Sequence, residues 1–135
     1  MTLAALHDRN EITEVLAGLG RWLDDKRWDD AAEVLTADVR VTTPGGVAEG
    51  REATVAQARR NHDEVTQHLF TNVIVDLDGD RASAVAESLI ALGAQRRVGS
   101  RYALGLVRTP AGWRIDALTV TPVWDTNPPS RTSAN

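Results

Sequence analysis

Asp24 and His68 are the two side chains in this sequence whose chemistry combines most readily. Asp24 lies near the end of a segment with helical periodicity, and His68 opens an apolar segment that alternates like a strand. A carboxylate that accepts a hydrogen bond from one imidazole nitrogen fixes the tautomer and leaves the other nitrogen free to take up a proton. The pair predicts a general base if the fold brings both side chains together. The spacing alone leaves open that His68 is an ordinary structural histidine.

Helical phase selects Asp24 over its neighbour Asp25. Residues 3–24 are predicted to form one amphipathic helix, because apolar side chains recur at intervals of three and four residues. A second stripe of small side chains ends at Asp24 and leaves space for a ligand, whereas Asp25 falls on a charged face. The apolar stripe consists of Ile12, Val15, Leu16, Leu19, Trp22 and Leu23, and the small stripe of Thr13, Ala17, Gly20 and Asp24.

The two-residue period of a strand gives His68 its expected neighbours. Phe70 and Asn72 should share its face and point with it into a pocket, followed by Ile74. Tyr102, the one tyrosine, either donates a hydrogen bond to a ligand oxygen or is a core ring, and both alternatives stay open. Glu87 is a reserve candidate for a second carboxylate in the pocket. The predicted substrate-contacting residues are Trp22, Phe70, Asn72, Glu87 and Tyr102.

The remaining pattern predicts an α+β fold, with helices against one face of a curved antiparallel sheet. A short helix is expected with Trp28, Ala31, Ala32 and Leu35 on one face, and a third helix is expected from Arg51 to about Asn61. The turn signals Pro44-Gly-Gly and Asp78-Gly mark hairpins. Residues 125–135 are polar and proline-rich and are expected to be a disordered tail after a single domain of residues 1–124. The expected strands cover residues 39–41, 47–49, 68–75, 82–92, 98–108 and 113–120.

Composition excludes several classes of function. The chain has 135 residues and a net charge of −4, which argues against nucleic acid as a partner. It has no cysteine, no signal-peptide pattern and no apolar run near the roughly 20 residues that span a bilayer, so we expect a cytoplasmic location and no membrane partner. Three scattered histidines predict no metal site, and nucleotide-binding motifs are missing. We therefore expect no cofactor, and a small molecule as the partner.

An ordered series of short motifs runs from about Arg9 to Val120. The motifs are Asp24-x-x-x-Trp28-Asp-x-x-Ala, Gly50-Arg-Glu-Ala, Thr66-x-His68-x-x-Thr-Asn72, Asp76-x-Asp-Gly-Asp80 and Gly112-Trp-Arg-Ile115. In this order they resemble SnoaL-like proteins of the nuclear transport factor 2-like superfamily. The resemblance implies a cone-shaped, cystatin-like barrel, in which a curved sheet wraps around the long helix and a deep pocket opens at one end. It also implies a homodimer formed through the sheet.

The scytalone dehydratase branch of the family is the nearest match. Its helix-end aspartate resembles Asp24, and its strand histidine resembles His68. The branch also has a second histidine on a later strand, and several dehydratases have tyrosines on the helices; this sequence has neither. At the position of the ketosteroid isomerase base the sequence has Thr43, which argues against isomerase chemistry.

The predicted function is a cofactor-independent lyase or cyclase that acts on a small, largely apolar, polyketide-like carbonyl compound. His68 would move the proton, and Asp24 would orient the imidazole of His68 and stabilise its charged form. Asn72 and Tyr102 would hold the carbonyl oxygen. The alternative is a non-catalytic ligand-binding or dimerisation module that uses the same cavity. In a third possibility the protein's own large side chains fill the cavity, namely Trp22, Phe70 and Trp124.

Overall fold

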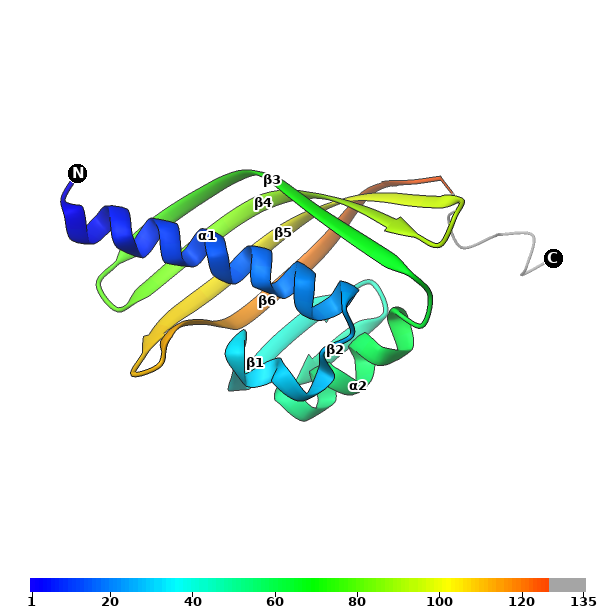
Figure 1. Cartoon of the computed structure of the whole chain (residues 1–135), viewed down its shortest axis with the longest axis horizontal. Coiled ribbons are helices and arrows are strands. Elements are labelled where there is room, and N and C mark those ends of the chain that lie inside the picture. The colour runs from blue at the N-terminus through cyan, green and yellow to red at the C-terminus, as the bar shows by residue number, and fades with distance from the viewer. Residues whose placement is uncertain (127–135) are drawn as a thin grey trace.

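A long N-terminal helix lies across one face of a curved sheet in the computed structural model, which describes residues 1–126 (Figure 1). The elements follow in the order α1 (Leu3–Asp24), the 3₁₀ helix η1 (Trp28–Glu33), β1 (Leu35–Thr43), β2 (Gly46–Glu49), α2 (Arg51–Asn61), β3 (Thr66–Asp78), β4 (Arg81–Leu92), β5 (Arg96–Thr109) and β6 (Gly112–Asp125). This is the predicted α+β class, with α1 and α2 as the two α-helices among these residues.

The six strands are arranged in the order β2-β1-β6-β5-β4-β3. Neighbouring strands are antiparallel, except for the parallel pair of β1 and β6. β2 and β3 form the two edges, so the sheet is curved and unclosed, and this curved sheet with the long helix against it is the fold that the resemblance implied. The long strands β3 to β6 form a meander, and its first two turns contain Gly79 and Gly93 at φ angles of 62° and 63°.

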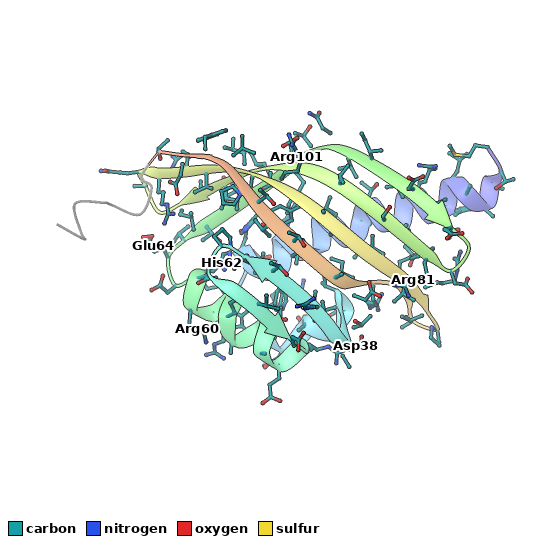
Figure 2. The ribbon with its side chains drawn as sticks, turned by 180° about the vertical axis from the view of Figure 1, so that it is seen from behind. Asp38, Arg60, His62, Glu64, Arg81 and Arg101 are labelled. Carbon is teal, nitrogen blue, oxygen red and sulfur yellow. The ribbon has the colours of Figure 1, made fainter. Side chains whose placement is uncertain are left out.

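α1 packs its predicted apolar stripe against the inner face of the sheet. Ile12 and Leu19 of α1 are at most 2% exposed, and Trp113 of β6 is completely buried. Burying such a side chain contributes about 1.5–3 kcal/mol, so this contact fixes where α1 lies along the sheet. Charged side chains such as Arg60 of α2 and Arg81 of β4 point away from this core (Figure 2).

The helices have the bounds that the sequence predicted, and both turn signals form the expected hairpins. The Thr2 hydroxyl caps the start of α1, because it accepts a hydrogen bond from the backbone N–H of Ala5 at 3.0 Å. Asp125 and Thr126 still bond to β5 where a tail was expected, and the rest of that expected tail, residues 127–135, lies outside the described residues. Within residues 1–126, no helix has both the length and the apolarity needed to cross a membrane.

A bulge in β3 changes which side chains face inward. The register between β3 and β4 shifts between Thr71 and Ile74, and Asn72 has a left-handed φ of 54°. The alternation is interrupted there, so that His68 is buried while Asn72 and Ile74 are exposed. The expectation that Asn72 points into a pocket with His68 is wrong for this reason.

α1 and β3 approach each other closely at Gly20. A Cβ atom on Gly20 would lie 3.1 Å from the ring of Phe70 and 3.4 Å from Cβ of His68. A side chain at this position would hold the last turn of α1 away from β3. Because Gly20 has no side chain, the last turn of α1 lies close to β3 and Asp24 reaches the start of that strand.

We expect Gly20→Val to lower the free energy of unfolding by about 1–3 kcal/mol, because the added methyl groups overpack the contact with Phe70. Gly18→Val is the matched control, since nothing lies within 4 Å of a Cβ atom on Gly18, and valine is a better helix former than glycine. Urea unfolding followed by circular dichroism measures both variants. Equal stability of the two would contradict the close packing of α1 on β3.

Candidate active site

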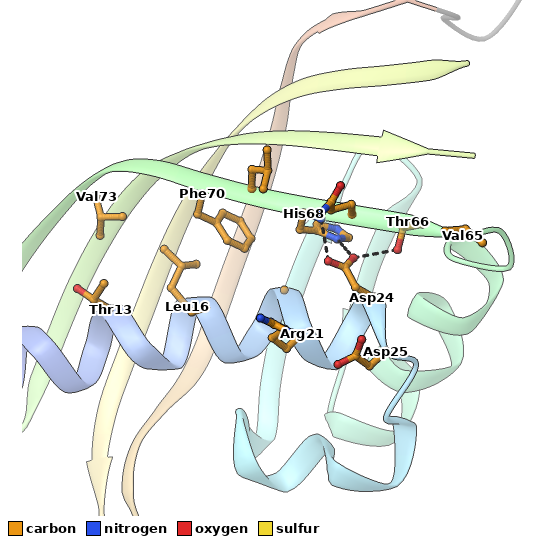
Figure 3. Close-up of a pocket in the computed structure, with 14 residues that line it drawn as sticks. Thr13, Leu16, Arg21, Asp24, Asp25, Val65, Thr66, His68, Phe70 and Val73 are labelled. Carbon is orange, nitrogen blue, oxygen red and sulfur yellow. Dashed lines mark hydrogen bonds and ion pairs between the residues drawn. The ribbon is translucent and has the colours of Figure 1, made fainter. Parts of the chain in front are cut away.

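Asp24, the last residue of α1, binds the start of β3 with both of its carboxylate oxygens (Figure 3). Oδ1 accepts hydrogen bonds from the Thr66 hydroxyl at 2.9 Å and from Nδ1 of His68 at 2.5 Å. Oδ2 accepts a hydrogen bond from the backbone N–H of His68 at 2.8 Å. The two side chains that the sequence analysis paired therefore contact each other directly.

The imidazole of His68 is completely enclosed, with none of its side chain exposed. Because a carboxylate only accepts hydrogen bonds, Nδ1 carries the hydrogen and Nε2 carries the lone pair of the neutral ring. Nε2 has no hydrogen-bond partner among the described residues. Burial lowers the pKa of His68, and the hydrogen bond to Asp24 partly opposes this shift. His68 is thus a neutral base with a vacant acceptor nitrogen.

His62 is a candidate functional residue that the sequence analysis missed. It directly follows α2, and the centroid of its ring lies 5.2 Å from that of His68. Its Nδ1 donates a hydrogen bond to the carbonyl oxygen of Ala58 at 2.8 Å. Burial lowers the pKa of His62. The sequence held one usable signal, because His62 ends a predicted helix that a short connection joins to the strand of His68.

Two hollows adjoin these rings. A groove of about 700 Å³ between α1 and β3 is lined in part by His68 and Phe70 (Figure 3). A second hollow, the inner cavity, has a volume of about 450 Å³ and is lined in part by His62 and Tyr102. The ring centroids of Phe70 and Tyr102 are 5.0 Å apart. The rings of these four residues therefore form a contiguous row, the wall, in which His68 and Phe70 line the groove and His62 and Tyr102 line the inner cavity.

The inner cavity is mainly apolar, with lining residues such as Leu19 of α1, Val98 of β5 and Leu118 of β6. Arg96 is the one arginine, lysine or carboxylate residue that residues 1–126 contribute to its lining, and Asp125 holds the guanidinium at 2.7 Å. No group of three or more His, Cys, Asp or Glu residues within the described part of the chain is placed to hold a metal ion. The cavity therefore suits an uncharged, largely apolar molecule.

Three of the predicted substrate-contacting residues lie at the inner cavity or in its wall. Trp22 and Tyr102 line the cavity and are 3% and 4% exposed. Phe70 stacks beside His68, with 6.2 Å between the ring centroids. Burial raises the pKa of Tyr102 far above its usual value, so the phenol keeps its proton and remains a hydrogen-bond donor.

Two side chains that were predicted to contact the substrate lie away from the site. So does Trp124, one of the large side chains that were expected to fill the cavity in the third possibility. Asn72 is exposed at the bulge of β3. Glu87 lies on the outer face of the sheet, because β4 alternates and turns Ser88 inward, and the Glu87 carboxylate binds Arg101 at 2.8 Å. Trp124 is 47% exposed and lies against Gly99, so it does not fill the cavity.

Comparison with known proteins places the chain in a family. A family model described as a SnoaL-like domain matches residues 4–119. The chain belongs to the SnoaL-like domain family. An uncharacterized protein of Mycobacterium tuberculosis is 31% identical to it over an alignment of 126 positions, and the match covers 85% of this chain and 85% of that one.

Solved structures share the fold of this SnoaL-like protein. A protein from Kribbella flavida has a TM-score of 0.85 at 23% identity, over 91% of this chain and 95% of that one. A candidate scytalone dehydratase from Novosphingobium aromaticivorans has a TM-score of 0.87 at 18% identity, over 97% and 94%. A hexachlorocyclohexane dehydrochlorinase from Novosphingobium barchaimii has a TM-score of 0.83 at 16% identity, over 92% of each chain. At these identities the likeness shows the fold alone.

We expect the free energy of unfolding to fall as the pH is lowered from about 6.5 towards 5. Burial lowers the pKa values of His62 and His68 in the folded state, so below the ordinary histidine pKa of about 6.5 the unfolded chain binds more protons. The stability that depends on neutral rings is complete above pH 6.5 and is lost as the pH falls through the lowered pKa values. Urea midpoints at pH 7.5 and pH 5.5 measure the effect.

The matched variants for this measurement are His62→Gln and His7→Gln. His62→Gln should show a smaller loss of stability between the two pH values, because one buried titrating ring is gone. His7 is exposed near the start of α1, so His7→Gln should lose as much stability as the wild type. An undiminished loss in His62→Gln would show that burial of this ring does not contribute to the pH dependence.

Proposed function

We propose that this protein is a cofactor-independent enzyme of the lyase or cyclase type, in which His68 moves a proton of a small, largely apolar, polyketide-like carbonyl compound. The observation that carries the proposal is the 2.5 Å hydrogen bond between Asp24 and Nδ1 of His68, which leaves Nε2 without a partner among the described residues. Two similarly folded proteins are named for eliminations, a dehydratase and a dehydrochlorinase. An elimination needs a base of this kind.

In the proposed reaction, Nε2 of His68 takes a proton from the carbon next to the carbonyl group. Asp24 stabilises the imidazolium that forms, because its carboxylate already binds Nδ1. Tyr102 donates a hydrogen bond to the carbonyl oxygen as negative charge develops there. Since the imidazole is enclosed, the substrate reaches Nε2 from the inner cavity by displacing a ring of the wall. The substrate is uncharged, in keeping with the apolar lining.

A non-catalytic ligand-binding module is the second candidate function. It is favoured by the complete enclosure of the His68 imidazole, because a base that no ligand reaches transfers no proton. In that case the same inner cavity binds a small apolar molecule without converting it. Binding of a ketone without exchange of its protons would support this second function.

We expect the wild-type protein to catalyse exchange of the protons next to the carbonyl of 2-tetralone for deuterium in D₂O. His68→Gln should lower the enzymatic rate by roughly 10²–10⁴-fold, because it removes the base. Asp24→Asn should lower it on the order of 10²-fold or more, since an amide also donates hydrogen bonds and stabilises the wrong tautomer of His68. Proton NMR of the ketone measures the rate, and circular dichroism checks the fold.

Asp25→Asn is the matched control for the exchange experiment. Asp25 is exposed beside Asp24, and the hydrogen bonds to His68 come from Asp24 and not from Asp25. This variant therefore removes a neighbouring carboxylate and should keep the wild-type rate. A His68→Gln variant that is folded and exchanges protons as fast as the wild type would exclude His68 as the base.

We also propose that two copies associate through the outer face of the sheet. Leu69, Leu89 and Trp124 are 54%, 41% and 47% exposed. Leu69 pairs with Leu89 across β3 and β4, while Gly99 of β5 pairs with both Leu89 and Trp124. These side chains form an apolar row across four strands, and contiguous exposed apolar surface of this kind is typical of an interaction site.

Leu89→Lys should convert this dimer to a monomer, because it places a charge in the middle of the apolar row. Val47→Lys is the matched control. Val47 is 49% exposed, but it lies on β2, the edge strand at the opposite end of the strand order from β3. Size-exclusion chromatography with light scattering measures the mass. A wild-type protein that is monomeric at about 100 μM, well above typical dimer dissociation constants, would refute the proposed interface.

A further inference from the structure

His62 combines three properties that the proposed reaction does not use. It lines the inner cavity, its ring lies 5.2 Å from that of His68, and its Nε2 receives no hydrogen bond from the described residues. Figure 2 shows His62 at the end of α2, inward of the loop residue Glu64. The side chain is half-buried, so a ligand in the cavity is able to touch it.

The tautomer of His62 follows from its backbone contact. The carbonyl oxygen of Ala58 only accepts hydrogen bonds, so Nδ1 of His62 must carry a hydrogen. In the neutral ring the lone pair is then on Nε2. Lys26 holds the adjacent backbone, because its ammonium group donates hydrogen bonds to the carbonyl oxygens of His62 and Glu64. The ring is thus positioned before any ligand binds.

The two histidines therefore present the same chemistry on neighbouring rings, of which His62 lines the inner cavity and His68 lines the groove. Each neutral ring has its Nδ1 hydrogen bonded elsewhere, to Asp24 or to Ala58, and each has a vacant acceptor at Nε2. Among the described residues, Asp24 and Lys26 are the charged groups that act on His62. An acceptor nitrogen in a mainly apolar cavity is matched by an uncharged donor on the ligand, and a hydroxyl group is the simplest such donor.

We propose that His62 is a ligand-binding and specificity-determining residue, whose Nε2 accepts a hydrogen bond from a hydroxyl group of the molecule in the inner cavity. This inference rests on the proposed use of that cavity as the ligand site. His62 would hold the hydroxyl, while Nε2 of His68 remains available for the carbon-bound proton. The preferred ligands are then uncharged apolar compounds that carry a hydroxyl group.

A pair of probes of equal size tests this role. 2-Naphthol and 2-methylnaphthalene differ by a hydroxyl in place of a methyl group, and isothermal titration calorimetry gives the dissociation constant of each. In His62→Leu, the affinity for 2-naphthol relative to that for 2-methylnaphthalene should fall by roughly 3- to 10-fold, because one buried hydrogen bond is lost. His62→Gln, which retains an acceptor oxygen, should restore part of the preference for 2-naphthol. His7→Leu, the control, should match the wild type.

A purely structural role of His62 would weaken both probes equally and leave their ratio unchanged. That unchanged ratio in His62→Leu would overturn the assignment, and it would place the hydroxyl on another acceptor such as Ser100 or Tyr102. Failure of both probes to bind the wild-type protein would overturn it as well. The deuterium-exchange experiment is separate, because a shifted ratio without any exchange would refute His68 as a base and leave His62 as the ligand contact.

Discussion

The contact between the end of α1 and the start of β3 is the interaction on which the rest of the site depends. Asp24 lies at the C-terminal end of a helix, where the helix dipole disfavours a carboxylate by about 0.3–1 kcal/mol. Three donors, from Thr66 and from both the backbone and the ring of His68, offset this cost. Gly20 allows the approach because a side chain there would meet Phe70. The position of the imidazole is therefore set by the packing of one helix on one strand.

Periodicity predicted the parts of this structure that repeat. The phase of α1 placed Asp24 beside the apolar stripe, and the predicted bounds of α1 and α2 are those of the structure. The predictions failed where the alternation of a strand is interrupted, and where the alternation does not show which face of the strand points inward. A single left-handed residue in β3 exposed Asn72, and periodicity alone did not show that Glu87 is on the outer face of β4.

His62 shows a different limit of reading a sequence. It belongs to no strand or helix face, since it directly follows α2, and its importance comes from a ring contact across a loop. Residue spacing along the sequence gives no information on how the end of α2 is oriented relative to the start of β3. That orientation is fixed by Lys26, which lies beyond the end of α1 at a left-handed φ of 55° and binds the backbone at His62. Three separate segments have to be placed before the two imidazoles meet.

The wall of four rings connects the electrostatics of the site to its selectivity. Enclosure lowers the pKa of His68 and so keeps it in the form that accepts a proton, yet the same enclosure restricts access to Nε2. A ligand that displaces a ring of the wall must replace the contacts that it breaks, which favours flat, apolar molecules. Asp24 and His68 belong to α1 and β3, whereas His62 follows α2 and is held by Ala58 of that helix and by Lys26. Under the proposed function, ligand preference is therefore able to change at His62 without disturbing the contact between Asp24 and His68.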